Sequence, residues 1–139
     1  MPSPNAAKIA GLIDLYPPAT TIGTVLLLTG GPASKTASIS TWLTYEISDY
    51  QGTGGRKSAV TPASGSYTIT NDGTWNWGTC IVPVVFNNTS GASNIVYQKA
   101  AIFTTDLSEI IAIAHDGFIQ DYYIYSGESK QINFTLRIR

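Results

Sequence analysis

The sequence predicts an all-β protein: a jelly-roll-like antiparallel β-sandwich with an extended N-terminal arm. After about residue 36, short segments of alternating apolar and polar residues follow one another, and glycine- and serine-rich turns separate them at near-regular spacing, as in sandwiches and barrels. Charged residues make up only 12% of the chain, about half of the ~25% found in an ordinary soluble domain. The chain has 139 residues, a length that predicts a single sandwich with its own core.

The last segment carries the clearest strand pattern. Ile132, Phe134 and Leu136 alternate with polar residues, so one face of this strand packs and the other meets water. Pro83 lacks a backbone donor, which predicts an edge position or a bulge, and His115-Asp116-Gly117 predicts a tight turn joining two strands. We expect the other strands, in chain order, at 40–48, 56–60, 66–70, 77–86, 94–103, 109–114 and 117–125.

Residues 1–35 differ from the sandwich domain expected over 36–139, and we interpret them as the N-terminal arm. A short helix is expected within 5–15, followed by one apolar strand within 17–34. Apolar residues at helical spacing give the helix an apolar face, which we expect to contact a neighbouring subunit. The alternative is that this segment packs on its own sandwich. The predicted partner-binding residues of the helix are Ile9, Leu12, Ile13, Leu15 and Tyr16.

Two groups of aromatic residues are candidate binding surfaces. Trp75 and Trp77 would share one face of an extended strand, where they either stack on a sugar ring or pack into the sandwich. The residues after them are apolar on both faces, which favours packing. Tyr122, Tyr123 and Tyr125 have polar tips of the kind enriched at subunit contacts, although ordinary sandwich packing explains them equally well.

Candidate catalytic groups are few. The single cysteine, Cys80, and the single histidine, His115, fit a buried apolar position and a turn better than a nucleophile and its base. We therefore expect no enzyme, no metal and no cofactor. A glycosidase-type carboxylate pair stays a distant alternative, because its members need only meet in space. The carboxylates considered for it are Asp72, Asp106, Asp116 and Asp121.

Charge and hydropathy bear on the class of partner. A net charge of −1 with no basic stripe offers nothing for a nucleic-acid backbone. The longest apolar run, Val25 to Leu28, is far shorter than the ~20 residues of a membrane-spanning helix. We therefore expect neither a nucleic-acid nor a membrane partner.

The stretch from Gly78 to Ala114 resembles the small jelly-roll structural proteins of tailed bacteriophages, which include capsid decoration (cement) proteins and tail-fibre modules. The resemblance is carried by an alternating strand that ends at Ala101-Ile102-Phe103, a polar loop over 105–108, and the apolar strand Ile110-Ile111-Ala112. It implies a non-enzymatic virion component on the capsid surface that bridges subunits of the major capsid protein, commonly as a homotrimer. The alternatives are a tail or fibre module, or a carbohydrate-binding module that uses Trp75 and Trp77.

Overall fold

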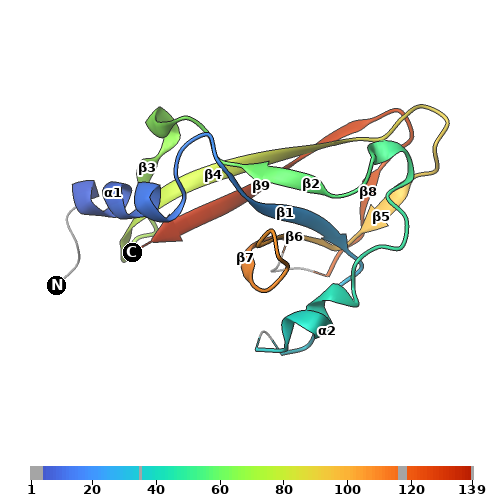
Figure 1. Cartoon of the computed structure of the whole chain (residues 1–139), viewed down its shortest axis with the longest axis horizontal. Helices are drawn as coiled ribbons and strands as arrows, with labels where there is room; N and C mark the ends of the chain where they lie inside the picture. Colours follow the sequence, from blue (N-terminus) through green and yellow to red (C-terminus); the bar gives the residue numbers. More distant parts are fainter. Residues whose placement is uncertain (1–4, 35, 116–118, 139) are drawn as a thin grey trace.

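The structure, a computed structural model, describes residues 5–34, 36–115 and 119–138 and confirms an all-β sandwich built from antiparallel sheets (Figure 1). One sheet has the strand order β2-β1-β6-β7, a second has β3-β4-β9, and β5 pairs with β8. Jelly-roll connectivity stays a prediction. The strands are β1 (Thr21–Leu28), β2 (Lys57–Val60), β3 (Thr68–Asn71), β4 (Asn76–Asn87), β5 (Ile95–Tyr97), β6 (Lys99–Phe103), β7 (Ile110–Ala114), β8 (Tyr122–Ile124) and β9 (Ser129–Ile138).

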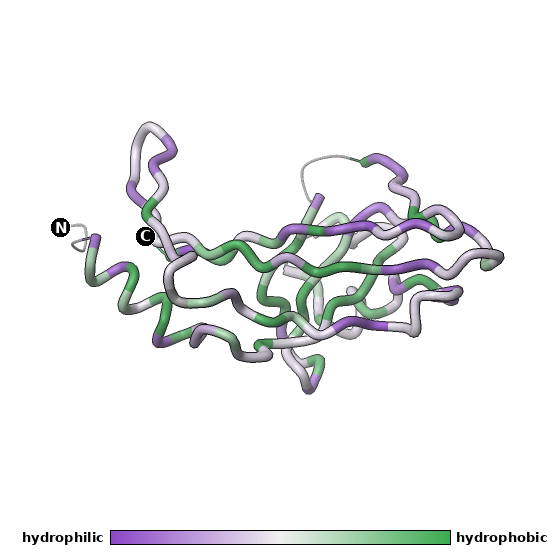
Figure 2. The backbone as a smooth tube through the Cα atoms, turned by 90° about the horizontal axis from the view of Figure 1, so that it is seen from above, coloured by the Kyte–Doolittle hydropathy of each residue, from purple (hydrophilic) through white to green (hydrophobic). Residues whose placement is uncertain are grey.

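The main core lies between the two larger sheets. Strands β4 and β9 pair in continuous register, for example Val82 with Phe134, and their inward residues are buried against the inward residues of β1 and β6. Figure 2 shows apolar residues recurring along these long strands. Alternation along a strand turns every second side chain toward the core, as predicted for β9. The inward residues of these four strands are Val25, Leu27, Cys80, Val82, Val84, Phe86, Ala100, Ile102, Ile132, Phe134 and Leu136.

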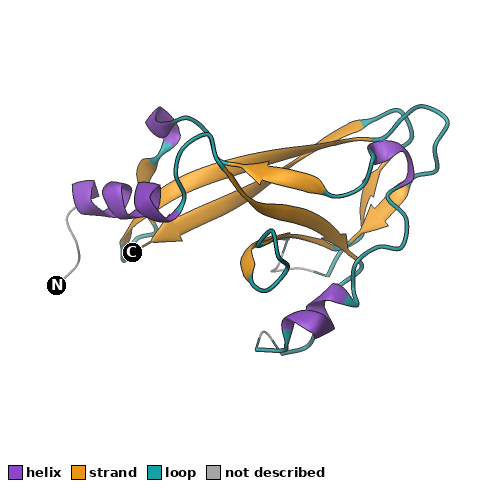
Figure 3. Cartoon of the chain, viewed as in Figure 1, coloured by secondary structure: helices purple, strands orange, loops and turns teal. Residues whose placement is uncertain are grey.

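A second apolar layer covers the outer face of the four-stranded sheet. Here the strand expected over 40–48 is wrong, because Ile39–Leu43 forms the short helix α2. Ser38 caps this helix by accepting a hydrogen bond from the Thr41 backbone N–H, a preferred arrangement at helix starts. The helix lies on the side of this sheet away from β4 and β9 (Figure 3), and its Trp42 is only 3% exposed. Trp42 packs with Leu26, Leu28, Ala101 and Phe103.

The N-terminal segment belongs to the sandwich. The helix α1 (Asn5–Leu15) packs against β4, β3 and β9, and β1 lies between β2 and β6. An extended arm is therefore wrong for the described part of residues 1–35, and the boundary expected before residue 36 would divide one continuous sheet. The physical reason is that β4 and β9 carry apolar residues at this end, which α1 covers with Leu12, fully buried.

Several strand boundaries and pairings differ from the sequence-based expectation. The segment 94–103 is divided at Gln98, whose backbone N–H donates to the Leu28 carbonyl. Strands β7 and β8 are not a hairpin, because β7 pairs with β6 whereas β8 pairs with β5; the predicted turn residues Asp116 and Gly117 lie outside the described residues. The edge position of Pro83 is confirmed, since β3 pairs with β4 only as far as Thr79. The remaining short helices are η1 (Gln51–Thr53) and η2 (Ser64–Ser66).

Candidate functional site

The β3–β4 hairpin holds the two tryptophans that the sequence singled out. Its turn is built around Asp72, whose Oδ1 accepts hydrogen bonds from the backbone N–H groups of Thr74 (2.9 Å) and Trp75 (2.7 Å). The Trp77 Nε1–H donates to Asp72 Oδ2 at 2.9 Å. These bonds stabilise the charged carboxylate, and those from Trp75, Trp77 and Thr74 lower the pKa of Asp72 to about 2.

The tryptophans do not pack into the core. Trp75 is 39% exposed and lies in the turn, because β4 begins only at Asn76, so strand alternation does not place the two indoles on one face. Trp77 is partly exposed, and the Arg137 guanidinium lies over its ring at 4.2 Å from the centroid. The expectation of core packing is therefore wrong, and one face of the Trp77 indole is already occupied by Arg137.

The outer face of the three-stranded sheet is uncovered in the described structure. The expectation that β4 is buried on both faces is wrong, because Ile81 and Val85 are 42% and 43% exposed and Pro83 between them is exposed too. Their register partners on β9 are polar, exposed and uncharged. We call this surface the open face; its residues are Ile81, Pro83, Val85, Gln131, Asn133 and Thr135.

The three tyrosines near the C-terminus divide into an inward and an outward set. Tyr122 turns inward and stacks on His115, with ring centroids 4.0 Å apart, and on Tyr97 at 5.6 Å. Tyr123 and Tyr125 point outward, 39% and 50% exposed, with rings 5.6 Å apart and only 7° from parallel. This second pair is exposed, whereas Tyr122 is half-buried.

Tyr97, which is buried, and His115, which is half-buried, form a polar pair beside Tyr122. The Tyr97 hydroxyl and His115 Nε2 have no hydrogen-bond partner among the described residues. Burial, with a contribution from the positive charge of Lys130, lowers the pKa of His115. Burial, with a contribution from Tyr122, raises the pKa of Tyr97 to about 12. Both side chains are therefore neutral near neutral pH.

Most of the apolar helix residues that were predicted to contact a neighbouring subunit pack against the core of their own chain. Leu12 is fully buried, and Ile9, Ile13 and Tyr16 pack partly buried against the same core, whereas Leu15 is 62% exposed. The backbone of α1 also approaches β4 closely: a Cβ on Gly78 would lie 3.0 Å from the Lys8 carbonyl oxygen. Of the five predicted contact residues, Leu15 alone leaves most of its side chain outside.

The candidate catalytic residues are not assembled into one site in the described structure. Cys80 is fully buried, and burial raises the pKa of its thiol, whereas His115 stacks on Tyr122. Among the carboxylates, Asp72 and Asp106 occupy different turns, Asp121 precedes β8, and Asp116 lies outside the described residues. Within the described ranges, no three His, Cys, Asp or Glu residues are grouped to hold a metal ion. No helix there has the length and apolar character to cross a membrane.

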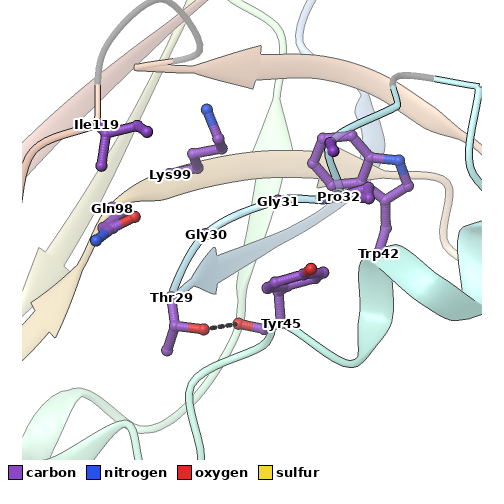
Figure 4. A pocket seen from close by; sticks show the side chains of 10 residues that line it. Thr29, Gly30, Gly31, Pro32, Trp42, Tyr45, Gln98, Lys99 and Ile119 are labelled. Atoms are coloured by element: carbon purple, nitrogen blue, oxygen red, sulfur yellow. Dashed lines mark hydrogen bonds between the residues drawn. The ribbon is translucent and has the colours of Figure 1, made fainter.

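A pocket that the sequence did not predict lies beside α2 (Figure 4). It has a volume of about 460 Å³ and is lined by Trp42, Tyr45 and Lys99, among others. The chain after β1 passes so close to the indole that a Cβ on Gly31 would lie 2.9 Å from the Trp42 ring. The pair Gly30-Gly31, one residue after the apolar strand β1, was the available signal for this close approach.

Comparison of the chain with protein-family models, with curated proteins and with solved structures finds no match. The class that the fold itself defines is an all-β sandwich with one uncovered sheet face.

Proposed function

We propose that this chain is a non-enzymatic structural virion protein, a decoration protein that binds the outside of a phage capsid and bridges major capsid protein subunits. The observation that carries the proposal is the open face. It presents Ile81 and Val85 to solvent at 42% and 43% exposure, in a row with Pro83, on a regular sheet.

The composition of the open face suits a protein partner. Burying apolar side chains contributes roughly 25 cal/mol per Å², and the flanking residues Gln131, Asn133 and Thr135 carry no charge that would have to be desolvated. An uncharged strip that combines an apolar row on β4 with a polar row on β9 is complementary to another protein surface of the same kind. A capsid shell offers such surfaces in many copies.

The resemblance of residues 78–114 to decoration proteins directs the proposal to a capsid. We assign the contact to the sheet rather than to α1, because α1 packs against its own β4. A homotrimer would present three open faces, and linked weak contacts strengthen one another through effective concentration. A tail or fibre location would use the same chemistry and is separated by the experiment below.

The test compares virions of the phage that encodes this chain, produced with and without it, by electron cryo-microscopy. Density on the outer shell should be present only in the first sample. Loss of density on the tail would instead support a tail or fibre module, and identical particles would contradict any virion role.

A matched pair of variants locates the contact. Ile81→Lys/Val85→Lys should weaken binding to undecorated shells by about tenfold or more, because it buries charge in an apolar contact. Val96→Lys, on β5 and equally exposed at 44%, should bind normally. Equal binding by all three proteins would exclude the open face as the contact surface.

A further inference from the structure

We infer that the pocket beside β8 binds a neutral saccharide, using Tyr123 and Tyr125 as its stacking surface. The pocket is widely open to solvent, and its volume of about 380 Å³ is at the lower end of the range of small-molecule sites. Its lining is polar and aromatic rather than aliphatic. The lining residues that matter for binding are Gln120, Asp121, Tyr123, Tyr125, Glu128 and Lys130.

The two tyrosines supply the surface that a sugar ring needs. They stand two residues apart, Tyr123 in β8 and Tyr125 just after its end. Their rings stack on each other, 5.6 Å apart and 7° from parallel, and both side chains are substantially exposed. A pyranose ring has a face of C–H groups and a rim of hydroxyls. An aromatic ring with a polar tip complements both, because its face takes the C–H groups while its hydroxyl bonds at the rim.

The Asp121 side chain and the backbone turn that carries Glu128 are held in place. Asp121 accepts a hydrogen bond from Gln98 Nε2 at 3.1 Å, and the backbone N–H of Glu128 donates to the Tyr125 carbonyl at 3.0 Å. The Lys130 ammonium lies 5.8 Å from the centroid of Tyr122. Groups ordered before a ligand arrives lose less entropy when they bind it.

The charge of the pocket selects the class of saccharide. Asp121 and Glu128 are hydrogen-bond acceptors that suit sugar hydroxyl donors, Gln120 adds an amide, and Lys130 is the one cationic group among these six residues. Two carboxylates against one ammonium disfavour sialylated or sulfated sugars. The pocket therefore fits a neutral, hydroxyl-rich saccharide.

This site is distinct from the tryptophan hairpin, where one face of the Trp77 ring is already covered by Arg137. It is also separate from the open face, with which it shares no residue. Figure 1 places β8 at the opposite end of the molecule from α1 and the β3–β4 hairpin. Sugar binding and capsid binding can therefore fail independently.

The experiment is a titration of the ¹⁵N-labelled full chain, followed by NMR. The probes are neutral oligosaccharides of glucose, galactose, mannose and N-acetylglucosamine, with sialyllactose as the acidic comparison and a tyrosine-binding proline-rich peptide as the alternative ligand. At least one neutral oligosaccharide should shift the amide signals of residues 120–130. Tyr123→Ala/Tyr125→Ala should weaken that binding by about tenfold, and Asp121→Asn should weaken it while keeping an acceptor for Gln98.

The control is Trp75→Ala, which removes an aromatic side chain as exposed as Tyr123 from the opposite end of the molecule. This variant should leave saccharide affinity unchanged. Three results would overturn the inference: no neutral saccharide binds, sialyllactose or the peptide binds more tightly, or Trp75→Ala abolishes binding while the tyrosine variant does not. The same variants are tested on capsid shells, where normal binding is expected, so the two proposals are judged separately.

Discussion

The two large sheets differ in how much of each is covered. The four-stranded sheet has apolar cover on both faces, the main core on one side and Trp42 with α2 on the other. In the part of the chain that the structure describes, the three-stranded sheet packs on its inner face and leaves Ile81 and Val85 substantially exposed on the other. An apolar residue thus stabilises the fold in the first sheet, whereas on the open face of the second it adds little to folding and is free to act in binding.

The largest expected effect compares one buried and one open position. Phe103→Ala, on the covered outer face of the four-stranded sheet and fully buried, should lower the free energy of unfolding by ~3–5 kcal/mol, because it leaves a cavity under α2. Val85→Ala on the open face should change it by about 0.5 kcal/mol or less. Urea denaturation of both variants measures the difference, and similar losses would mean that the open face is covered in solution.

The next prediction concerns α1, which covers one end of the three-stranded sheet. Leu12→Ala should cost ~2–5 kcal/mol, since its fully buried side chain fills the space between the helix and β4. Leu15→Ala is the matched control on the same helix at 62% exposure and should cost about 0.5 kcal/mol or less. If Leu12→Ala melts like the unmodified protein, the helix is a detachable arm, as first expected from its sequence.

The smallest effect is a pH dependence at the hairpin of the three-stranded sheet. Asp72 has a folded pKa of about 2, below its ordinary value of 3.8. The folded state therefore binds its proton more weakly, so the stabilisation is present above pH 3.8 and is lost as pH falls through about 2. NMR titration of the Asp72 carboxyl should report a midpoint near that value.

The control for Asp72 is Trp77→Phe, which removes the indole donor and keeps an aromatic ring. It should raise the pKa of Asp72, because the charged form loses one hydrogen bond. An unchanged midpoint would show that the indole bond does not form in solution, and the hairpin end of this sheet would then be less ordered than described.

Local patterns predicted much of the fold, because the alternation of apolar and polar residues in a strand indicates which of its faces is buried. The alternation ending in Phe134 and Leu136 predicted β9, and the missing donor of Pro83 predicted its edge position. The same patterns failed where pairing partners decide the outcome. The segment around Trp42 became a helix under the cap of Ser38, and no local signal indicated that β7 and β8 pair with different strands.

The candidate sites were the least predictable part. The sequence marked Trp75, Trp77 and the tyrosines as aromatic candidates, but it could not tell which rings face solvent, because Trp75 lies in a turn and Arg137 reaches Trp77 from a strand far along the chain. The open face could not be predicted either, because Ile and Val are residue types usually found in a core, and nothing in the sequence shows that Ile81 and Val85 are exposed.

By itself, the sequence determined the class of this protein: the period-two alternation and the turn residues permit a β-sandwich, and the low charge leaves its surface polar but largely neutral. Only the tertiary structure decided that α1 packs on its own core. It also decided that the four-stranded sheet has apolar cover on both faces, whereas the described three-stranded sheet has it on one. The exposure of Tyr123 and Tyr125 beside a polar pocket was decided in the same way. The physical reason is that alternation is a property of each strand, whereas the cover over a face comes from residues distant in the chain.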